Sequence, residues 1–279
     1  MKTEIVKIDS EHIEEDRIRR AGDIIKEGGL VAFPTETVYG LGGDALDADS
    51  SRKIYAAKGR PSDNPLIVHI ADFADLEKIV TEVPKEAVQL ADAFWPGPLT
   101  MILNKNEKVP YETTGGMDTV AIRMPSHPVA LAFIRAGGGY IAGPSANTSG
   151  KPSPTLAEHV ALDLDGKIPM ILDGGEVGIG IESTIVDLTE DVPMILRPGY
   201  ITPEMIEKVI GEVKVDPGII ASDSAKKPKA PGMKYKHYAP KADLVLVDGE
   251  SGAVVEKINA LAQEMEAQGK TVSYTHLRA

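Results

Sequence analysis

The segments Lys58–Pro65 (KGRPSDNP) and Pro144–Gly150 (PSANTSG) hold the side chains that are best suited to binding chemistry in this chain. In the first segment, Lys58 and Arg60 flank a glycine, and two prolines bring Asn64 back beside these cations. Arginine makes planar bidentate contacts with phosphate, and lysine offers a mobile point charge. Cations at a helix C-terminus are also favoured by the helix dipole without any ligand. The pattern predicts one wall of a site for a phosphorylated ligand, with helix stabilisation as the alternative.

The second segment offers the Ser145 hydroxyl and the Asn147 amide among residues that form turns. Short polar groups of this kind are also common in solvent-exposed loops. The position of the segment favours a site, because it directly follows a short strand predicted at Tyr140–Ala142. Ligands of open α/β sheets bind beyond the carboxyl ends of the strands. We therefore expect Pro144–Gly150 to form the opposite wall.

Further polar residues lie at the ends of other predicted strands. Thr37 lies in a glycine-rich turn, where backbone amides can approach a ligand closely or the threonine can cap the strand end. Arg123 and Arg197 each close an apolar strand and are either rim salt bridges or anion anchors. Ser183 stands just before another strand. His69 lies within a strand, where a buried core histidine is the commoner role.

Composition limits the chemistry that these residues can perform. The absence of cysteine excludes disulfides, thiolate nucleophiles and cysteine-based metal sites, and the six histidines are scattered, so no dedicated metal site is predicted. No catalytic triad, GxxxxGK[ST] loop or GxGxxG loop is present. The inventory of cations and hydroxyls indicates catalysis by positioning and charge neutralisation on a nucleotide, with magnesium assisting.

The location of the protein also follows from composition. No apolar stretch approaches the length of about eighteen residues that a membrane-spanning helix needs. The first residues alternate charge with isolated apolar side chains, which is unlike a signal peptide. These features predict a cytoplasmic protein without membrane contact. The net charge of −12 opposes strong non-specific binding to nucleic acid, so any cationic site must be built locally.

The elements that must position the site residues alternate along the chain, which predicts an α/β fold with a twisted, mostly mixed open sheet and flanking helices. Helices are expected at Ile13–Glu27, Ser50–Lys58 (capped by Ser50 or Ser51), Lys85–Phe94, His127–Arg135 and Thr202–Ile210. Strands are expected at Glu4–Ile8, Leu30–Phe33, Leu66–Ile70, Leu99–Leu103, Val120–Met124, Tyr140–Ala142, Ile168–Leu172, Ser183–Leu188 and Pro193–Arg197.

A shift in composition predicts the domain boundaries. Residues 1–212 are expected to form the main domain and 213–241 a basic, proline-rich linker. Residues 242–279 would begin a second α/β domain, with a strand at Asp243–Val247, an amphipathic helix at Gly252–Gln268 and a further strand starting at Thr271–Tyr274. So few residues are too little to fold alone. We therefore expect a truncated second domain that ends in a few non-native residues.

An ordered set of motifs resembles the YrdC-like threonylcarbamoyl-AMP synthases over roughly residues 10–210. The motifs are PTETVYGL from Pro34, KGRPxxNPL from Lys58, PSANxSG from Pro144 and ESTIVD from Glu182. The run PGMKYKHYAP from Pro231 resembles the linker of the two-domain version of that family. The resemblance implies that L-threonine, bicarbonate and ATP give threonylcarbamoyl-AMP and pyrophosphate, the first step towards threonylcarbamoyladenosine in tRNA.

The resemblance also implies roles for individual residues. ATP would be held by Lys58, Arg60, Asn64, Ser145, Asn147, Arg197 and Tyr238, with Lys58 and Arg60 acting in catalysis. Threonine would be held by Thr37, His69, Arg123 and Ser183. Tyr238 would close over the nucleotide as part of a linker lid. ATP is then a substrate that arrives with magnesium, and no metal site belongs to the protein itself.

The sequence is also compatible with two other functions. The same fold could serve as a non-catalytic RNA-binding module, which the net charge disfavours although the basic linker could form a local patch. It could also transfer a carbamoyl group from carbamoyl phosphate, but related proteins of that type carry extra domains. For the synthase reading, the expected partners are downstream proteins that move the threonylcarbamoyl group to tRNA, and tRNA itself is not expected to bind tightly.

Overall fold

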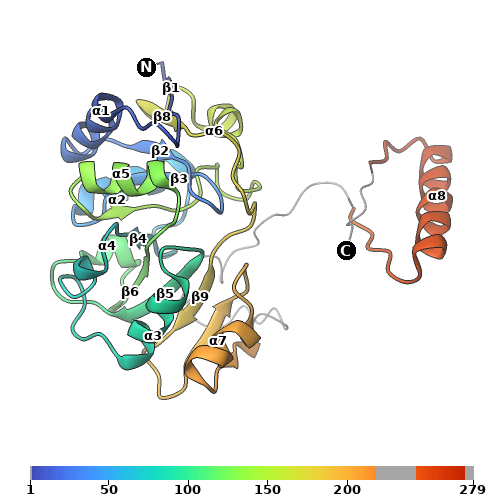
Figure 1. Cartoon of the computed structure of the whole chain (residues 1–279). Coiled ribbons are helices and arrows are strands. Elements are labelled where there is room, and N and C mark those ends of the chain that lie inside the picture. The colour runs from blue at the N-terminus through green and yellow to red at the C-terminus, as the bar shows by residue number, and fades with distance from the viewer. Residues whose placement is uncertain (1, 218–242, 274–279) are drawn as a thin grey trace. The chain divides into compact units, whose positions relative to one another are not determined.

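A computed structural model of the chain describes residues 2–217 and 243–273 (Figure 1). The chain divides into two compact units, Met1–Ala239 and Pro240–Ala279. The first unit is built on an eleven-stranded sheet in the order β1-β8-β2-β3-β7-β4-β6-β5-β9-β10-β11. The sheet contains both parallel and antiparallel neighbours. The predicted mixed α/β sheet is therefore confirmed.

The strands are β1 (Glu4–Lys7), β2 (Val31–Phe33), β3 (Gly40–Asp44), β4 (Ile67–His69), β5 (Leu99–Asn104), β6 (Thr119–Arg123), β7 (Ile141–Ala142), β8 (Met170–Asp173), β9 (Thr184–Asp187), β10 (Met194–Arg197) and β11 (Lys214–Val215). The helices of the first unit are α1 (Glu15–Lys26), α2 (Ala48–Lys58), α3 (Lys85–Phe94), α4 (Tyr111–Thr114), α5 (Pro128–Ala136), α6 (Ala157–Leu164) and α7 (Pro203–Ile210), with a 3₁₀ turn η1 at Phe73–Asp75.

Alternation along the strands divides the core between the two faces of the sheet. On β2, Val31 and Phe33 pack with α1 and α5, whereas Ala32 belongs to the cluster on the opposite face. Side chains of successive strand residues point to opposite faces, so both faces of β2 are buried. Figure 1 shows α1 and α5 side by side over this part of the sheet. The larger cluster takes up apolar residues of α2, α3, α6 and α7.

The ends of several central strands meet at one place in the sheet. His69, the last residue of β4, is in register with Arg123, the last residue of β6. Arg123 in turn lies opposite Thr100 of the antiparallel strand β5. Arg197 ends β10 and lies opposite Ile185 of β9. Because β5 and β9 run parallel, the residues just before β9 lie beside the start of β5 and close to these strand ends.

Several elements of the first unit differ from the predictions. The strand β3 was expected to be a glycine-rich turn, but glycine is required there by packing, since a Cβ on Gly42 would lie 2.9 Å from the Ile141 side chain. The helices α4 and α6, the turn η1 and the strand β11 were not predicted. The N-cap of α2 is Asp47 and not a serine, because the Asp47 carboxylate accepts from the backbone amides of Asp49 and Ser50.

The second unit is described only over residues 243–273. Its helix α8 (Ser251–Ala267) confirms the predicted helix. The predicted strand at Asp243–Val247 is wrong, since these residues have no regular structure and Leu244 is 90% exposed. A strand needs a neighbour to accept its backbone hydrogen bonds, and no described residue pairs with this segment. Residues 271–273 are likewise without regular structure, and Tyr274 lies outside the described residues.

The helix α8 has one half-buried face in the structure. No residue of the helix is fully buried, and Val255 is exposed, whereas Val254, Ile258, Leu261 and Met265 are half-buried. The predicted linker, residues 213–241, lies mostly outside the described residues. The predicted domain boundaries therefore remain a prediction.

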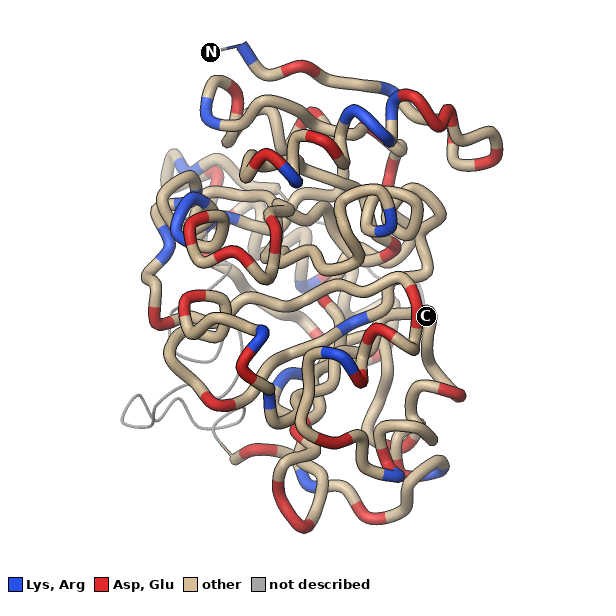
Figure 2. Tube along the Cα trace, turned by 90° about the vertical axis from the view of Figure 1, so that its left-hand side faces the viewer, with Lys and Arg blue, Asp and Glu red and all other residues tan. Residues whose placement is uncertain are grey.

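Charged side chains are spread widely over the chain. Figure 2 shows acidic residues distributed along the described trace, with lysine and arginine dispersed among them. Within the described parts, no helix has the combination of length and apolar character that crossing a membrane requires.

Candidate active site

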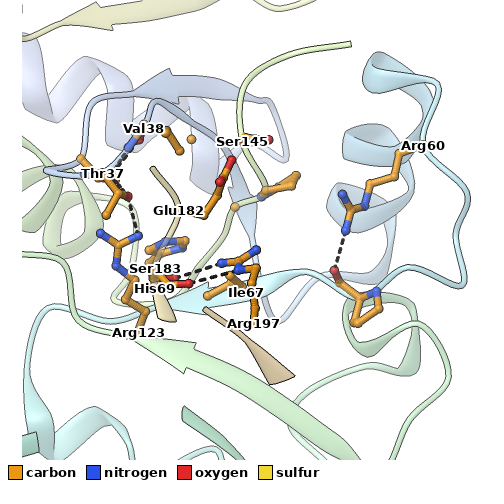
Figure 3. A pocket seen from close by; sticks show the side chains of 15 residues that line it. Thr37, Val38, Arg60, Ile67, His69, Arg123, Ser145, Glu182, Ser183 and Arg197 are labelled. Atoms are coloured by element: carbon orange, nitrogen blue, oxygen red, sulfur yellow. Dashed lines mark hydrogen bonds between the residues drawn. The ribbon is translucent and has the colours of Figure 1, made fainter. Parts of the chain in front are cut away.

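A cavity of about 290 Å³ lies where the central strands end (Figure 3). Its walls come from the loop after β2, the end of α2, the ends of β4, β6 and β10, the loop after β7 and the residues before β9. The lining residues are Thr35, Thr37, Val38, Gly40, Arg60, Pro65, Ile67, His69, Arg123, Gly143, Pro144, Ser145, Glu182, Ser183 and Arg197.

Most of the residues that the sequence singles out line this cavity. These are Thr37, Arg60, His69, Arg123, Ser145, Ser183 and Arg197. Lys58, Asn64 and Asn147 are buried in the segments that form the walls but are not among the lining residues. Tyr238 lies outside the described residues. The structure thus brings together two segments that are far apart in the sequence, as the polar patterns predict.

Arg123 is held in place by three partners. It is buried, with 4% of its surface exposed. One terminal nitrogen donates to Thr37 Oγ1 at 2.9 Å, and the other forms an ion pair with Glu36 Oε1 at 2.6 Å. Its Nε donates to the Gly97 carbonyl at 3.3 Å. The second Glu36 oxygen accepts from the Ser126 amide at 3.1 Å. A buried guanidinium of this kind presents a fixed positive charge to the cavity.

Arg197 and Ser183 form a second fixed pair. Arg197 donates to the Ser183 carbonyl at 3.0 Å through Nε and to Ser183 Oγ at 3.1 Å through a terminal nitrogen. The Ser183 hydroxyl also lies 2.7 Å from Thr100 Oγ1. These contacts tie the end of β10 and the start of β9 to β5. As a result, a cation and a hydroxyl are presented side by side at the cavity wall (Figure 3).

His69 is the buried titratable base of the cavity wall. Burial, and then the nearby positive charge of Arg123, lower the pKa of His69 from its usual value to about 3. The imidazole is therefore neutral near physiological pH. Its Nδ1 is buried and has no hydrogen-bond partner in the structure. An unpaired buried polar atom is costly, which makes this atom a candidate contact for a ligand.

Lys58 joins the two walls in this structure. Its ammonium donates to the backbone carbonyls of Ser145 and Asn147, and its own carbonyl accepts from the Ser149 amide at 2.9 Å. Burial, and then the positive charge of Arg60, lower the pKa of Lys58 well below its usual value, while Asp163 acts in the opposite direction. The ammonium thus fixes the loop after β7 and does not line the cavity.

Arg60 remains at the cavity, held by its own segment. Its Nε donates to the Asn64 carbonyl at 3.2 Å, and a terminal nitrogen donates to the Pro65 carbonyl at 3.0 Å. The prolines therefore bring Asn64 back beside Arg60, as the sequence predicts. Gly59 permits this turn because it adopts φ 61° at the end of α2.

The loop after β7 is fixed by side chains as well. Asn147 Nδ2 donates to the carbonyls of Thr148 and Lys151, and Asp163 accepts from the Thr148 amide at 2.8 Å. Asn147 Oδ1 is buried without a partner in the structure. The loop is therefore a built wall with one acceptor that remains unsatisfied, rather than a solvent loop.

Two acidic residues of the site were not singled out from the sequence. Glu36 anchors Arg123, and Glu182 lines the cavity. Glu182 stands in the motif that also supplies Ser183, so its proximity to that serine was the available signal. Cations and hydroxyls are the side chains that a predicted anion site favours, so the sequence does not single out these two carboxylates.

The fold and the cavity define an open α/β protein with a cationic, hydroxyl-rich site at the meeting point of its strand ends. This chain belongs to the Sua5/YciO/YrdC family, since the model of that family, described as "Telomere recombination", matches residues 23–199. A second model, described as "Threonylcarbamoyl-AMP synthase, C-terminal domain", matches residues 201–278. The predicted membership in a YrdC-like family is confirmed.

Relatives with curated names agree with the family assignment. The chain is 56% identical over 262 residues to a threonylcarbamoyl-AMP synthase of Pyrococcus abyssi, which covers 94% of this chain and 77% of that protein. It is 54% identical over 259 residues to a threonylcarbamoyl-AMP synthase of Bacillus subtilis, covering 92% of this chain and 73% of that protein.

Solved structures agree with the fold. The crystal structure of P. abyssi Sua5 complexed with L-threonine matches with a TM-score of 0.92 at 53% identity, over 98% of this chain and 82% of that chain. The crystal structure of E. coli YciO matches with a TM-score of 0.65 at 25% identity, over 71% of this chain and 96% of that chain.

Proposed function

We propose that this chain is an L-threonylcarbamoyladenylate synthase, which joins L-threonine, bicarbonate and ATP into threonylcarbamoyl-AMP and releases pyrophosphate. It would transfer AMP and so act as a nucleotidyltransferase. The names of the relatives and the threonine in the P. abyssi Sua5 crystal structure support the proposal. The observation that carries it is the meeting of Arg60, Arg123 and Arg197 with several hydroxyls in one cavity.

The chemistry requires positive charge more than a nucleophilic side chain. The threonine amine takes up bicarbonate to form a carbamate, and a carbamate oxygen attacks the α-phosphorus of ATP while pyrophosphate leaves. The carbamate and the triphosphate are both anions and repel each other, so fixed cations lower the barrier. The three arginines of the cavity can supply this stabilisation. Positioning of the two reactants next to each other lowers the reaction barrier further.

Threonine would be held by Thr37, His69, Arg123 and Ser183. Arg123 is the natural partner of the threonine carboxylate, because its guanidinium is buried and already orientated by Glu36. The unpartnered Nδ1 of His69 offers a hydrogen-bonding position for a polar group of threonine. This arrangement would leave the threonine amine directed towards the remainder of the cavity.

ATP would be held by the two walls. Arg60, Ser145 and Arg197 line the cavity and would contact the phosphates directly. Asn64 and Asn147 lie in the same walls, and Asn147 Oδ1 is a buried acceptor without a partner in the structure. Lys58 would reach a phosphate only by exchanging the loop carbonyls that it now contacts. The proposed role of Tyr238 as a lid residue remains a prediction.

Magnesium would enter with ATP and be held mainly by the phosphates, as is usual for this ion. The described residues contain no group of three or more histidine, aspartate or glutamate side chains placed to hold a metal. A nucleotide-borne ion is compatible with this donor set, since magnesium commonly retains several waters and needs few protein ligands.

The remaining proposals concern the cell. We infer a cytoplasmic enzyme whose product passes to proteins that modify tRNA, without tight binding of tRNA by this chain. Residues 1–212 would hold the catalytic domain, 213–241 a linker and 242–279 the start of a second domain. No observation on the described residues favours the alternative of a non-catalytic RNA-binding module.

Calorimetric titration of the purified chain with L-threonine tests the site. We expect heat of binding with L-threonine and at least about tenfold weaker binding of L-valine, because a site that hydrogen-bonds a hydroxyl rejects the analogue that lacks it. Equal binding of the two amino acids would contradict the proposed threonine pocket. Arg123→Lys should lose most of the affinity, because it removes the bidentate geometry.

A further inference from the structure

The formation of the carbamate raises a requirement that the cationic residues do not meet. Amines are largely protonated near neutral pH, and a protonated amine has no lone pair with which to attack carbon. An ammonium must also enter a cavity that is lined by Arg60, Arg123 and Arg197. A group in the cavity should therefore attract the ammonium and take one of its protons.

Two lining residues, His69 and Glu182, have side chains of a type that can accept a proton. His69 is fully enclosed, and burial and Arg123 lower its pKa to about 3, so it is a weak base and carries no charge that would attract a cation. Glu182 is a half-buried carboxylate that remains in contact with solvent. The chemistry of the two groups favours Glu182.

Glu182 also differs from the other carboxylate of the site in its partners. Glu36 is committed to Arg123 and to the Ser126 amide. Glu182 Oε1 accepts only the Ser153 hydroxyl, and among residues 2–217 and 243–273 the structure records no ion pair for it. Its negative charge is therefore not neutralised by a described neighbour. A carboxylate of this kind attracts a substrate cation.

The backbone fixes the position of Glu182. The preceding segment is attached to the loop after β2, because the Gly180 amide donates to the Thr37 carbonyl at 3.0 Å. The following residue is held through its carbonyl by Arg197. A Cβ at Gly199 would lie 2.6 Å from the Glu182 carbonyl oxygen, so the chain packs tightly here. Figure 3 shows Glu182 between Thr37 on one side and Ser145 on the other.

We infer that Glu182 pairs with the ammonium of the amino-acid substrate and acts as the base that frees the amine for carbamate formation. The inference rests on the proposed function. One proton passes from the ammonium to the Glu182 carboxylate. The nitrogen lone pair forms the N–C bond to bicarbonate, the C–O bond to the bicarbonate hydroxyl breaks, and that hydroxyl leaves as water with a second proton from nitrogen. Glu182 then returns its proton to solvent.

Glu182→Gln is the variant that tests this role. Glutamine keeps an oxygen that can accept the Ser153 hydroxyl, so the structural contact survives while the base is lost. Glu176→Gln is the matched control, because Glu176 is exposed, lies in the same segment and does not line the cavity. Among the described residues, the charged and titratable groups that share the cavity with Glu182 are Arg60, His69, Arg123 and Arg197, and Glu36 is paired with Arg123; both variants keep all of them.

Turnover is measured as pyrophosphate release with saturating ATP and bicarbonate, at about pH 7 and about pH 9. We expect Glu182→Gln to lose at least about 100-fold at the lower pH and less than about 10-fold at the higher pH, where the amine loses its proton to solvent. Glu176→Gln should stay within about twofold at both values, since it touches no substrate.

Affinity for magnesium-ATP and the melting temperature are measured on the same samples. Both should be unchanged in Glu182→Gln. An equal loss at both pH values, a loss of magnesium-dependent ATP affinity, or near-normal turnover would each overturn the assignment of Glu182 as the base. If the unaltered protein releases no pyrophosphate in response to threonine, the proposed function itself fails, and the two failures are thereby distinguished.

Discussion

At the scale of single residues, the site combines fixed cations with a neutral, buried histidine. Arg123 and Arg197 are held by protein contacts before any substrate arrives. Such preorganised charges need no reorganisation during the reaction, which is what makes them effective. Their placement would allow an acidic protein to bind the anionic reactants of the proposed reaction.

Arg60→Ala should lower turnover by at least about 100-fold, corresponding to about 3 kcal/mol of lost charge stabilisation. Arg52→Ala is the control, because Arg52 lies in the helix α2 that precedes Arg60, is exposed and pairs with Asp49 and Glu112. It should change turnover by less than about twofold. Similar rates in both variants would show that Arg60 does not contact the phosphates. Lys58→Ala is a poorer probe, since it also releases two loop carbonyls.

His69 predicts how stability depends on pH. Its pKa is about 3 in the folded protein and near its usual value of 6.5 in the unfolded chain. The unfolded state therefore binds the extra proton between these values, and stability is lost as the pH falls through this range. The contribution of His69 is up to about 1.4 kcal/mol per pH unit.

Urea unfolding of the protein and of His69→Gln between about pH 6.5 and about pH 4.5 measures this contribution. The free energy of unfolding should fall less steeply with decreasing pH in the variant. The two slopes should differ by up to about 1.4 kcal/mol per pH unit, which corresponds to one bound proton. Equal slopes of the unfolding free energy against pH in the two proteins would mean that His69 takes up its proton in the folded state as readily as in the unfolded chain.

At the scale of secondary structure elements, the helix α2 leads into the wall segment Lys58–Pro65, and the stability of this helix depends on its N-cap. Asp47→Ala removes an acceptor from the amides of Asp49 and Ser50 and should cost about 1 kcal/mol of stability in urea unfolding. Asp49 is an exposed neighbour in the same turn, and Asp49→Ala should cost only a few tenths of a kcal/mol, ~0.3 kcal/mol, of stability. An equal loss in both variants would show that Asp47 is not the cap.

The sequence predicted most elements because their periodicity is strong. It failed at β3, where glycines normally indicate a turn, because the need for glycine comes from the close approach of Ile141 and cannot be seen locally. It failed at Asp243–Val247, where apolar residues favour a strand but no described partner accepts it. Cations and hydroxyls of the site were predictable from motifs. Glu182 was not, because its role depends on the residues that surround it.

At the scale of the whole molecule, an acidic protein contains a locally cationic cavity. The net charge of −12 and the dispersed charges in Figure 2 disfavour broad contact with nucleic acid. The arginines gather instead at the point where strands from both halves of the sequence end. The sheet order therefore assembles a site that no single segment of the chain contains.

The release of pyrophosphate tests the central claim most directly. Purified protein is incubated with magnesium-ATP, L-threonine and bicarbonate, and with each of these omitted in turn. We expect pyrophosphate only when all three are present, together with threonylcarbamoyl-AMP detected by mass spectrometry. Undiminished release without threonine, or none with the complete mixture, would contradict the assignment of this chain as a threonylcarbamoyladenylate synthase.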